Sequence, residues 1–195
     1  AWEMGFERDP MDNLGRLRWT QDGEGYINYY SYNPVTGGQA YAALDVNPAS
    51  PGSDITSGSS GNWDAVSVGS ASSNQPTRGG SLPAALNLAT KTYYDGHGRS
   101  IRTVDRDGAE HHTVYLNLLT IEFPYWNSGT SQCLVPIQIT QLNSNWQVTD
   151  RISVRATYSA ISTSRGVPTG FSTVPGQSDY VRWTHTTYDS AGRVS

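Results

Sequence analysis

The chain has 195 residues, of which 36% are hydrophobic and 15% are charged, and its formal net charge is −4. Both shares are low for a globular domain, and Gly, Ser, Thr and Asn take up the difference, which excludes a charged disordered tail and a helical bundle and favours an all-β protein rich in turns. Lys91 is the only lysine and no basic run occurs, which argues against a nucleic-acid partner, and no stretch is apolar enough to predict a membrane span.

The first part of the chain predicts two hairpins separated by a long polar segment. Short strands alternate with Asp-Gly turns, which are strong signals for a β-hairpin. For the first hairpin we expect a strand over 16–20, a turn over 22–25, a return strand over 26–32 and a degenerate turn over 32–37. A Ser-, Gly- and Pro-rich loop follows over 47–83, with one short strand candidate at 63–68 and at most a short turn of helix over 81–90. For the second hairpin we expect a strand over 99–104, a turn at 107–108 and a return strand over 109–118.

The remainder predicts a longer hairpin. Hydrophobic residues alternate at Ile152, Val154, Ala156 and Tyr158, which is typical of a half-buried strand. We expect a strand over 118–123, strands over 134–142 and 146–158 joined at 143–145, a loop over 162–178 and a strand over 180–187, with no amphipathic helix. The single cysteine, Cys133, has no partner for an intramolecular disulfide and lies in an apolar run, so we expect a buried, unreactive thiol.

An internal repeat is the most informative pattern. The sequence Asp-x-x-Gly-Arg occurs three times, and tyrosine precedes two of the copies. The motif residues are Asp12, Gly15 and Arg16; Tyr94, Asp95, Gly98 and Arg99; and Tyr188, Asp189, Gly192 and Arg193. The first two copies also align without a gap over a whole hairpin unit, at an offset of 83 residues (12 to 95). The aligned identities include Thr20 with Thr103, Asp22 with Asp105, Gly25 with Gly108 and Tyr32 with Tyr115.

Each motif residue has a physical role in this interpretation. The aspartate fixes a turn by accepting hydrogen bonds from nearby backbone amides, and the glycine allows the positive φ that such a turn requires. The arginine ties adjacent rungs together through paired hydrogen bonds. The motif is therefore expected to be structural rather than catalytic.

A Tyr-Asp-x-x-Gly-Arg turn followed by a strand, a Gly-containing turn and a Tyr-rich return strand resembles the YD repeats of Rhs proteins, teneurins and the shell components of insecticidal toxin complexes. The resemblance implies stacked antiparallel β-hairpins in a spiral sheet, which in such large, exported proteins closes into a hollow shell that often encloses a toxic C-terminal domain. This chain departs from the pattern in its long insertions and its few, partly degenerate repeats. The family's self-cleaving aspartate site is not present, so no autoprotease residue carries over.

We expect five regions on this basis. They are a YD-like hairpin repeat (1–46), a loop insertion (47–83), a YD hairpin repeat (84–118), a β-hairpin insertion with loops (119–179) and the truncated start of a further YD repeat (180–195). A hairpin unit cannot bury its apolar face alone. We therefore expect a segment of a much longer protein or one unit of an assembly, with neighbouring repeats, identical subunits, surface glycans or an enclosed cargo as partners.

The sequence offers no strong catalytic or metal signal, and we predict no cofactor, no metal and no enzyme. The adjacent His111 and His112 would face opposite sides of a strand, and no His/Cys spacing typical of zinc occurs. The segment 105–110 has a passing likeness to an acidic calcium loop but is better interpreted as a hairpin turn. A polysaccharide-degrading enzyme would need two carboxylates close together. The candidates are Glu3, Glu7, Asp9 and Glu122, and nothing in the sequence brings two of them together.

The leading hypothesis is an extracellular, cell-surface β-scaffold of prokaryotic source that forms part of a shell, tube or fibre. The alternative is a carbohydrate-binding or adhesion module whose exposed aromatic rings stack on sugars. Its candidate rings are Trp19, Tyr29, Tyr30, Tyr125 and Trp126. Packing between sheet layers explains the same rings equally well.

Overall fold

The computed structural model describes residues 14–46, 82–86 and 88–195, and the chain divides into two compact units, Ala1–Thr92 and Tyr93–Ser195. Antiparallel hairpins build both units, and no closed barrel forms among the described strands. The predicted all-β class with stacked antiparallel hairpins is confirmed. Among the described residues the only helical element is the short 3₁₀ turn η1 (Gln177–Asp179).

The first unit contains β1 (Trp19–Gln21), β2 (Ile27–Tyr32), β3 (Gln39–Leu44) and β4 (Leu88–Tyr94), whose last two residues belong to the second unit. Each strand pairs with the next along the chain. Alternate residues of β2 turn to one face, as the period of two in a strand requires. The small core of the unit consists of Ile27, Tyr29, Ala43 and Val46, with Trp19, Tyr41 and Ala89 packed against it.

The second unit carries a larger sheet, in which the strand order is β5-β6-β7-β9-β10-β13 and β8 pairs with β7. A separate two-stranded ribbon is formed by β11 and β12. The bounds are β5 (Ser100–Val104), β6 (Glu110–Leu116), β7 (Leu119–Asn127), β8 (Gln132–Cys133), β9 (Ile137–Leu142), β10 (Val148–Val154), β11 (Ile161–Ser164), β12 (Val167–Phe171) and β13 (Tyr180–His185).

The core of the second unit is a row of aliphatic side chains across neighbouring strands. The register places Val114 opposite Ile121, Ile121 opposite Ile139, and Ile139 opposite Ile152. Side chains directly opposite on one face of a sheet are in contact range, so the row packs as a continuous stripe. The last three of these residues are buried, which fixes the face of the sheet that must be covered.

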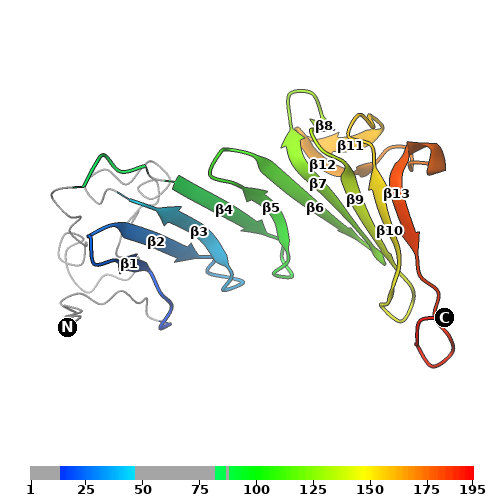
Figure 1. The fold of residues 1–195 in the computed structure, drawn as a ribbon, viewed down its shortest axis with the longest axis horizontal. Helices are drawn as coiled ribbons and strands as arrows, with labels where there is room; N and C mark the ends of the chain where they lie inside the picture. The colour runs from blue at the N-terminus through cyan, green and yellow to red at the C-terminus, as the bar shows by residue number, and fades with distance from the viewer. Residues whose placement is uncertain (1–13, 47–81, 87) are drawn as a thin grey trace. The chain divides into compact units, whose positions relative to one another are not determined.

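The β11–β12 ribbon covers that face at one end of the sheet (Figure 1). The ring of Phe171 packs at 5.8 Å from Phe123 and at 5.6 Å from Tyr158, measured between ring centroids. The indole N–H of Trp126 donates to the carbonyl of Gly166 over 2.8 Å, which ties β7 to the ribbon. The ribbon therefore acts as the second layer of the core.

The prediction of a loop over 162–178 is wrong, because the segment contains most of the β11–β12 ribbon and η1. Arg165 and Gly166 both have positive φ, at 52° and 79°, and Ser164 pairs with Val167 across them. Two consecutive residues with positive φ are the signature of a type I′ hairpin turn. Arginine is an uncommon residue for the first of these positions, and so the turn is hard to predict from sequence.

The short turn of helix considered for 81–90 is also wrong where the structure describes it, because residues 88–90 open strand β4. The strand β3 was not predicted. The strand predictions over 26–32, 99–104, 109–118 and 180–187 are confirmed within a few residues at each end. The strand predicted over 146–158 is too long, because β10 ends at Val154 and a turn at 156–157 breaks the alternation before Tyr158. The strand candidate at 63–68 lies outside the described residues.

Cys133 is 4% exposed, and burial raises the pKa of its thiol to about 12. Because of this raised pKa, the thiol stays protonated at neutral pH, and the thiolate, which is the reactive form of cysteine, does not form. The predicted burial of Cys133 is confirmed. Within the described part of the chain, no helix is long and apolar enough to cross a membrane.

Candidate functional site

The corner at Asp95 is a closed, hydrogen-bonded turn of five residues. The carboxylate oxygen Oδ1 of Asp95 accepts from the backbone N–H groups of His97 and Arg99, both at 2.9 Å. Its other oxygen, Oδ2, accepts from Nε and Nη2 of Arg99 at 2.8 and 2.7 Å. Gly98 has φ of 80°, a conformation that costs an L-residue about 1–2 kcal/mol. The aspartate, the glycine and the arginine of the motif therefore all act on one turn.

The corner at Asp189 repeats this geometry. Its Oδ1 accepts from the backbone N–H groups of Ala191 and Arg193 at 2.9 Å, and its Oδ2 accepts from Nε of Arg193 at 2.8 Å. Gly192 has φ of 78°. Tyr188, the residue before the motif, donates its hydroxyl to the carbonyl of Val148 over 2.8 Å and so anchors the corner to β10. Two copies of the motif therefore fold alike.

The arginine of the Asp95 corner also reaches the return strand of its hairpin. The guanidinium carbon of Arg99 lies 4.3 Å from the ring centroid of Tyr115, in cation–π contact. The hydroxyl of Tyr115 donates to the carbonyl of Ser100 over 3.1 Å. The corner, the outgoing strand and the return strand are thereby held together by one arginine–tyrosine pair.

The same arrangement occurs 83 residues earlier, in the first unit. Arg16 lies 4.5 Å above the ring of Tyr32, and the Tyr32 hydroxyl donates to the carbonyl of Leu17 over 2.8 Å. Gly15 has φ of 71°. Each of these residues is the counterpart, at the same offset, of one in the Asp95 hairpin. Asp12, the acid of this copy, lies outside the described residues.

The turn geometry extends beyond the motif copies. Asp22, Asp105 and Asn143 each use their backbone N–H to bond the carbonyl four residues on, and each accepts at its own carbonyl from the N–H three residues on. Asn143 also accepts at Oδ1 from the N–H groups of Asn145 and Gln147. A neutral amide thus supplies the same two backbone bonds as the Asp95 carboxylate.

Protonation of Asp95 is expected to weaken its corner. The backbone amide and the guanidinium of Arg99 hold the pKa of Asp95 below its ordinary value of 3.8. A group whose pKa is lower in the folded state stabilises the fold above its unfolded pKa of about 3.9 and loses that contribution as the pH falls. We expect Asp95→Asn to lower the unfolding temperature at pH 7, and the deficit to shrink below about pH 4 as the wild-type carboxylate is protonated.

The control for this variant is Asp22→Asn. Asp22 accepts from three backbone N–H groups, and its corner has Tyr26 where the motif has arginine. Thermal unfolding between pH 7 and 3 measures both variants against the wild type. A deficit in Asp95→Asn that does not change with pH, or that matches the deficit in Asp22→Asn, would show that the arginine pairing contributes nothing.

The five candidate stacking rings differ in their exposure. Tyr29 and Trp126 are 7% and 5% exposed and belong to the two cores, so neither offers a free ring face. Trp19 and Tyr30 are half-buried, and Trp19 packs against the first core. Tyr125 is 42% exposed. Of the five, only Tyr125 is an exposed ring.

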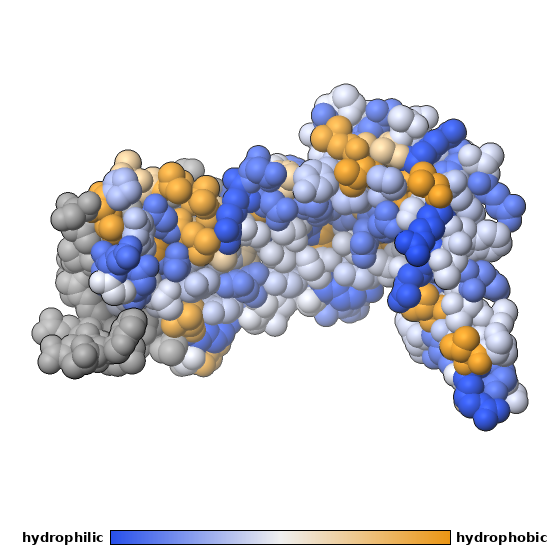
Figure 2. Space-filling model, viewed as in Figure 1, coloured by the Kyte–Doolittle hydropathy of each residue, from blue (hydrophilic) through white to orange (hydrophobic). Residues whose placement is uncertain are grey.

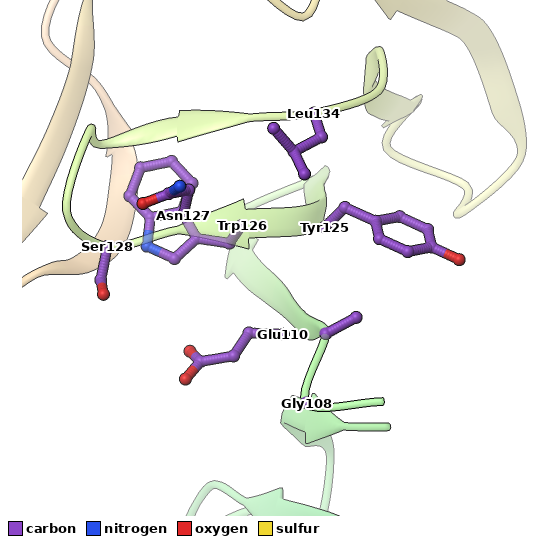
Figure 3. A pocket seen from close by; sticks show the side chains of 8 residues that line it. Gly108, Glu110, Tyr125, Trp126, Asn127, Ser128 and Leu134 are labelled. Carbon is purple, nitrogen blue, oxygen red and sulfur yellow. The ribbon is translucent and has the colours of Figure 1, made fainter. Parts of the chain in front are cut away.

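A hollow of about 280 Å³ lies beside Tyr125 and Trp126, between the start of β6 and the end of β7 (Figure 3). Figure 3 shows the two rings pointing in opposite directions, at a β-bulge where Tyr125 has φ of 48° and the register with β6 shifts. Tyr125 packs edge-on against His111, with ring centroids 4.8 Å apart. The two rings therefore do not form a joint platform for a sugar.

A larger groove of about 480 Å³ lies in the second unit, between one face of β5 and β6 and the strand β12. On this face the register places Arg102 directly opposite His112. Nη2 of Arg102 bonds Oε1 of Glu110 at 2.6 Å, and Oε2 of Glu110 contacts Nε2 of His112 at 2.9 Å. The ring of Tyr93 lies 5.0 Å from the guanidinium carbon of Arg102.

Charges in this groove depend on burial. His112 is 3% exposed, and burial lowers the pKa of its imidazole, although the neighbouring Glu110 acts against this. Burial tends to raise the pKa of Glu110, but the hydrogen bonds from Arg102 and His112 outweigh it and the pKa is lowered. The groove therefore holds a neutral histidine, a carboxylate and a guanidinium at neutral pH.

This groove was not predicted from the sequence. The sequence feature that indicates it is the pair Glu110 and His112, which are two residues apart on a strand and therefore share a face of the sheet. The segment 105–110 forms the predicted hairpin turn, in which Oδ2 of Asp105 contacts Nε2 of His111 at 3.0 Å. The two adjacent histidines thus have different carboxylate partners.

No group of three or more metal-ligating side chains occurs in the described ranges. Glu122 lies exposed in β7, whereas Glu3, Glu7 and Asp9 lie outside the described residues. No protein-family model matches the chain, and a search of curated proteins found no match.

Proposed function

We propose that the chain is a structural segment of an extracellular β-scaffold of the YD-repeat type, and that it forms part of a shell, tube or fibre at the cell surface. The observation that carries this proposal is the recurrence of one built corner: Asp95 and Asp189 hold their arginines in the same way. The pairs of Arg16 with Tyr32 and Arg99 with Tyr115 also match at one offset.

The physical argument concerns what the motif residues do. In the corners at Asp95 and Asp189 the carboxylate accepts hydrogen bonds from two backbone N–H groups and from the arginine side chain, and the glycine takes the positive φ of the turn. A tyrosine hydroxyl, from Tyr115 or Tyr188, then bonds a backbone carbonyl of a neighbouring segment. A module with this design converts a short sequence into a strand reversal of defined geometry, which is the requirement for stacking many hairpins in register. Exposed apolar residues on the visible face, including a cluster over the region of β8 and β12 (Figure 2), give such a stack surfaces for neighbours.

Electron microscopy of the native particle, isolated from its source without dissociation, tests the proposal. We expect a hollow shell, tube or fibre with a wall made of one β-sheet. The proposal fails if the native particle is an isolated globule of about the mass of this chain, 21.2 kDa.

A further inference from the structure

The sheet of the second unit has a polar face opposite its core. The strands β7, β9, β10 and β13 lie side by side in that order (Figure 1), and the residues between Ile121, Ile139, Ile152 and their neighbours turn away from the core. The register arranges these residues in two rows across the strands, which we call the polar face, and none of them is buried. The first row is Thr120, Thr140, Arg151 and Thr184, and the second is Glu122, Gln138, Ser153 and Arg182.

Two exposed arginines are neighbours on this polar face. Arg151 lies opposite Thr184 and Arg182 lies opposite Ser153, so the two arginines are diagonal neighbours on adjacent strands, with Cα atoms about 7–8 Å apart. Among the described residues neither guanidinium has an ion-pair partner. At this spacing both long side chains can reach one oxygen anion from two sides.

The acids of the second unit do not neutralise these arginines. Asp150 is next to Arg151 in sequence, but it lies on the opposite face, where it bonds Trp183 and His185. Glu122 shares the polar face but lies three strand spacings, or about 14 Å, from the β13 row position, which exceeds the Debye length of about 8 Å in physiological salt. The other acids are engaged elsewhere: Asp95, Glu110, Asp179 and Asp189 pair with arginines, Asp105 pairs with His111, and Asp107 bonds the backbone of its own turn.

Hydroxyl groups extend the positive site across the sheet. Thr120, Thr140 and Thr184 stand in one row with Arg151, each about 4.8 Å from the next strand. None of the three hydroxyls bonds another described residue, so all of them are available to a ligand. Neither row contains an aromatic ring, which makes the polar face flat and hydrophilic.

We propose that the polar face binds an acidic polysaccharide, with a sulfate or carboxylate group between Arg151 and Arg182 and the sugar hydroxyls along the threonine row. The planar fork of arginine matches either oxyanion. A nucleic-acid duplex fits less well, because it is bound through many phosphate contacts, and a single strand needs aromatic rings on which its bases stack. An acidic peptide has no row of hydroxyls to pair with the threonines. This inference does not depend on the proposed scaffold role.

Calorimetry on the whole chain at low salt measures binding. Dextran sulfate and polygalacturonate are the acidic probes, and neutral dextran of equal length is the comparison. We expect at least one acidic probe to bind, the neutral dextran not to bind, and added salt to weaken binding because the arginines are exposed. The tighter of the two acidic probes identifies the anionic group. No binding of either acidic probe, or equally tight binding of polyglutamate or of a DNA duplex, would overturn the proposal.

The double variant Arg151→Gln/Arg182→Gln localises the site. It is expected to weaken binding by at least about tenfold, because each exposed ion pair contributes up to about fivefold. The matched control is Arg106→Gln/Arg165→Gln, which removes the same charge from two exposed arginines in the β5–β6 and β11–β12 turns. We expect the control to bind within about twofold of the wild type, since surface charge far from the site is screened. Equal loss in the two double variants contradicts the proposal.

Thr140→Val tests the threonine row, because it removes one hydroxyl and keeps a β-branched side chain in the middle of the sheet. Binding is expected to weaken roughly threefold, the usual worth of a neutral hydrogen bond. Thr163→Val is the control, since Thr163 is an exposed threonine of β11 outside the polar face. Unchanged binding in Thr140→Val, or the same loss in Thr163→Val, contradicts the placement of the sugar. Circular dichroism confirms that each variant is folded before its binding is measured.

Discussion

Replacing Trp126 by alanine is expected to destabilise the second unit by about 3–5 kcal/mol, the usual cost of removing a large buried aromatic side chain. Trp126 is 5% exposed, packs edge-on against Phe123 with ring centroids 5.8 Å apart, and donates its indole N–H to the carbonyl of Gly166. The substitution leaves a cavity in the core and an unpaired carbonyl in the ribbon turn. Urea unfolding of the whole chain, followed by circular dichroism, measures the change.

Tyr125→Ala is the control, because Tyr125 precedes Trp126 in the same strand and is 42% exposed. Its loss is expected to cost less than about 1 kcal/mol, as is usual for surface positions. The comparison also bears on the glycan-stacking hypothesis, since a ring in the core contributes to the stability of the fold and presents no face to a sugar. Equal unfolding free energies for the two variants would contradict the assignment of Trp126 to the core.

Gly98→Val is expected to destabilise the Asp95 corner by about 2 kcal/mol. At φ of 80° the glycine occupies the left-handed region, which costs ordinary L-residues about 1–2 kcal/mol and β-branched residues more. The strain falls on the turn that joins β4 to β5, so the corner opens before the core does. Thermal unfolding of the whole chain gives the global change, and hydrogen exchange at the amides of His97 and Arg99 gives the local one.

The matched control is Gly96→Val, which places the same side chain two residues earlier in the same turn. Gly96 lies outside the left-handed region, and no atom lies within 4 Å of the Cβ that a substitution would add. A small effect is therefore expected there. If Gly98→Val were tolerated as well as Gly96→Val, the glycine of the motif would have no conformational role.

The corners could be predicted from the sequence because their causes are local. An aspartate, a glycine and an arginine within five residues are enough to close the Asp95 turn, since each bond joins residues at most four apart. The same reasoning gives limited help at Asn143, where the residue in the left-handed conformation is Trp146, with φ of 63°. Asn143 indicates that a turn begins there, but a tryptophan gives no indication that its residue takes a positive φ.

The β11–β12 ribbon could not be predicted in the same way. Its turn uses Arg165 and Gly166 in place of an Asn-Gly or Asp-Gly pair, and its strands are short and rich in Ser, Thr, Gly and Pro. The energy that holds it comes from contacts distant in sequence, such as Phe171 with Phe123 and Trp126 with Gly166. Such contacts leave almost no periodic signal in the segment itself.

The sequence by itself determined the all-β class and the hairpin corners, because alternation and turn chemistry act over a few residues and need no distant partner. Tertiary structure alone decided which face of the sheet became a core. A β-bulge at Tyr125, whose φ is 48°, returns Trp126 to the same core as Phe123 and leaves Tyr125 exposed, and the ribbon, 40 residues further on, bonds Trp126. Tertiary structure also placed Arg102 across from His112, with Glu110 bonded to both, since strand register rather than local sequence chooses which side chains meet.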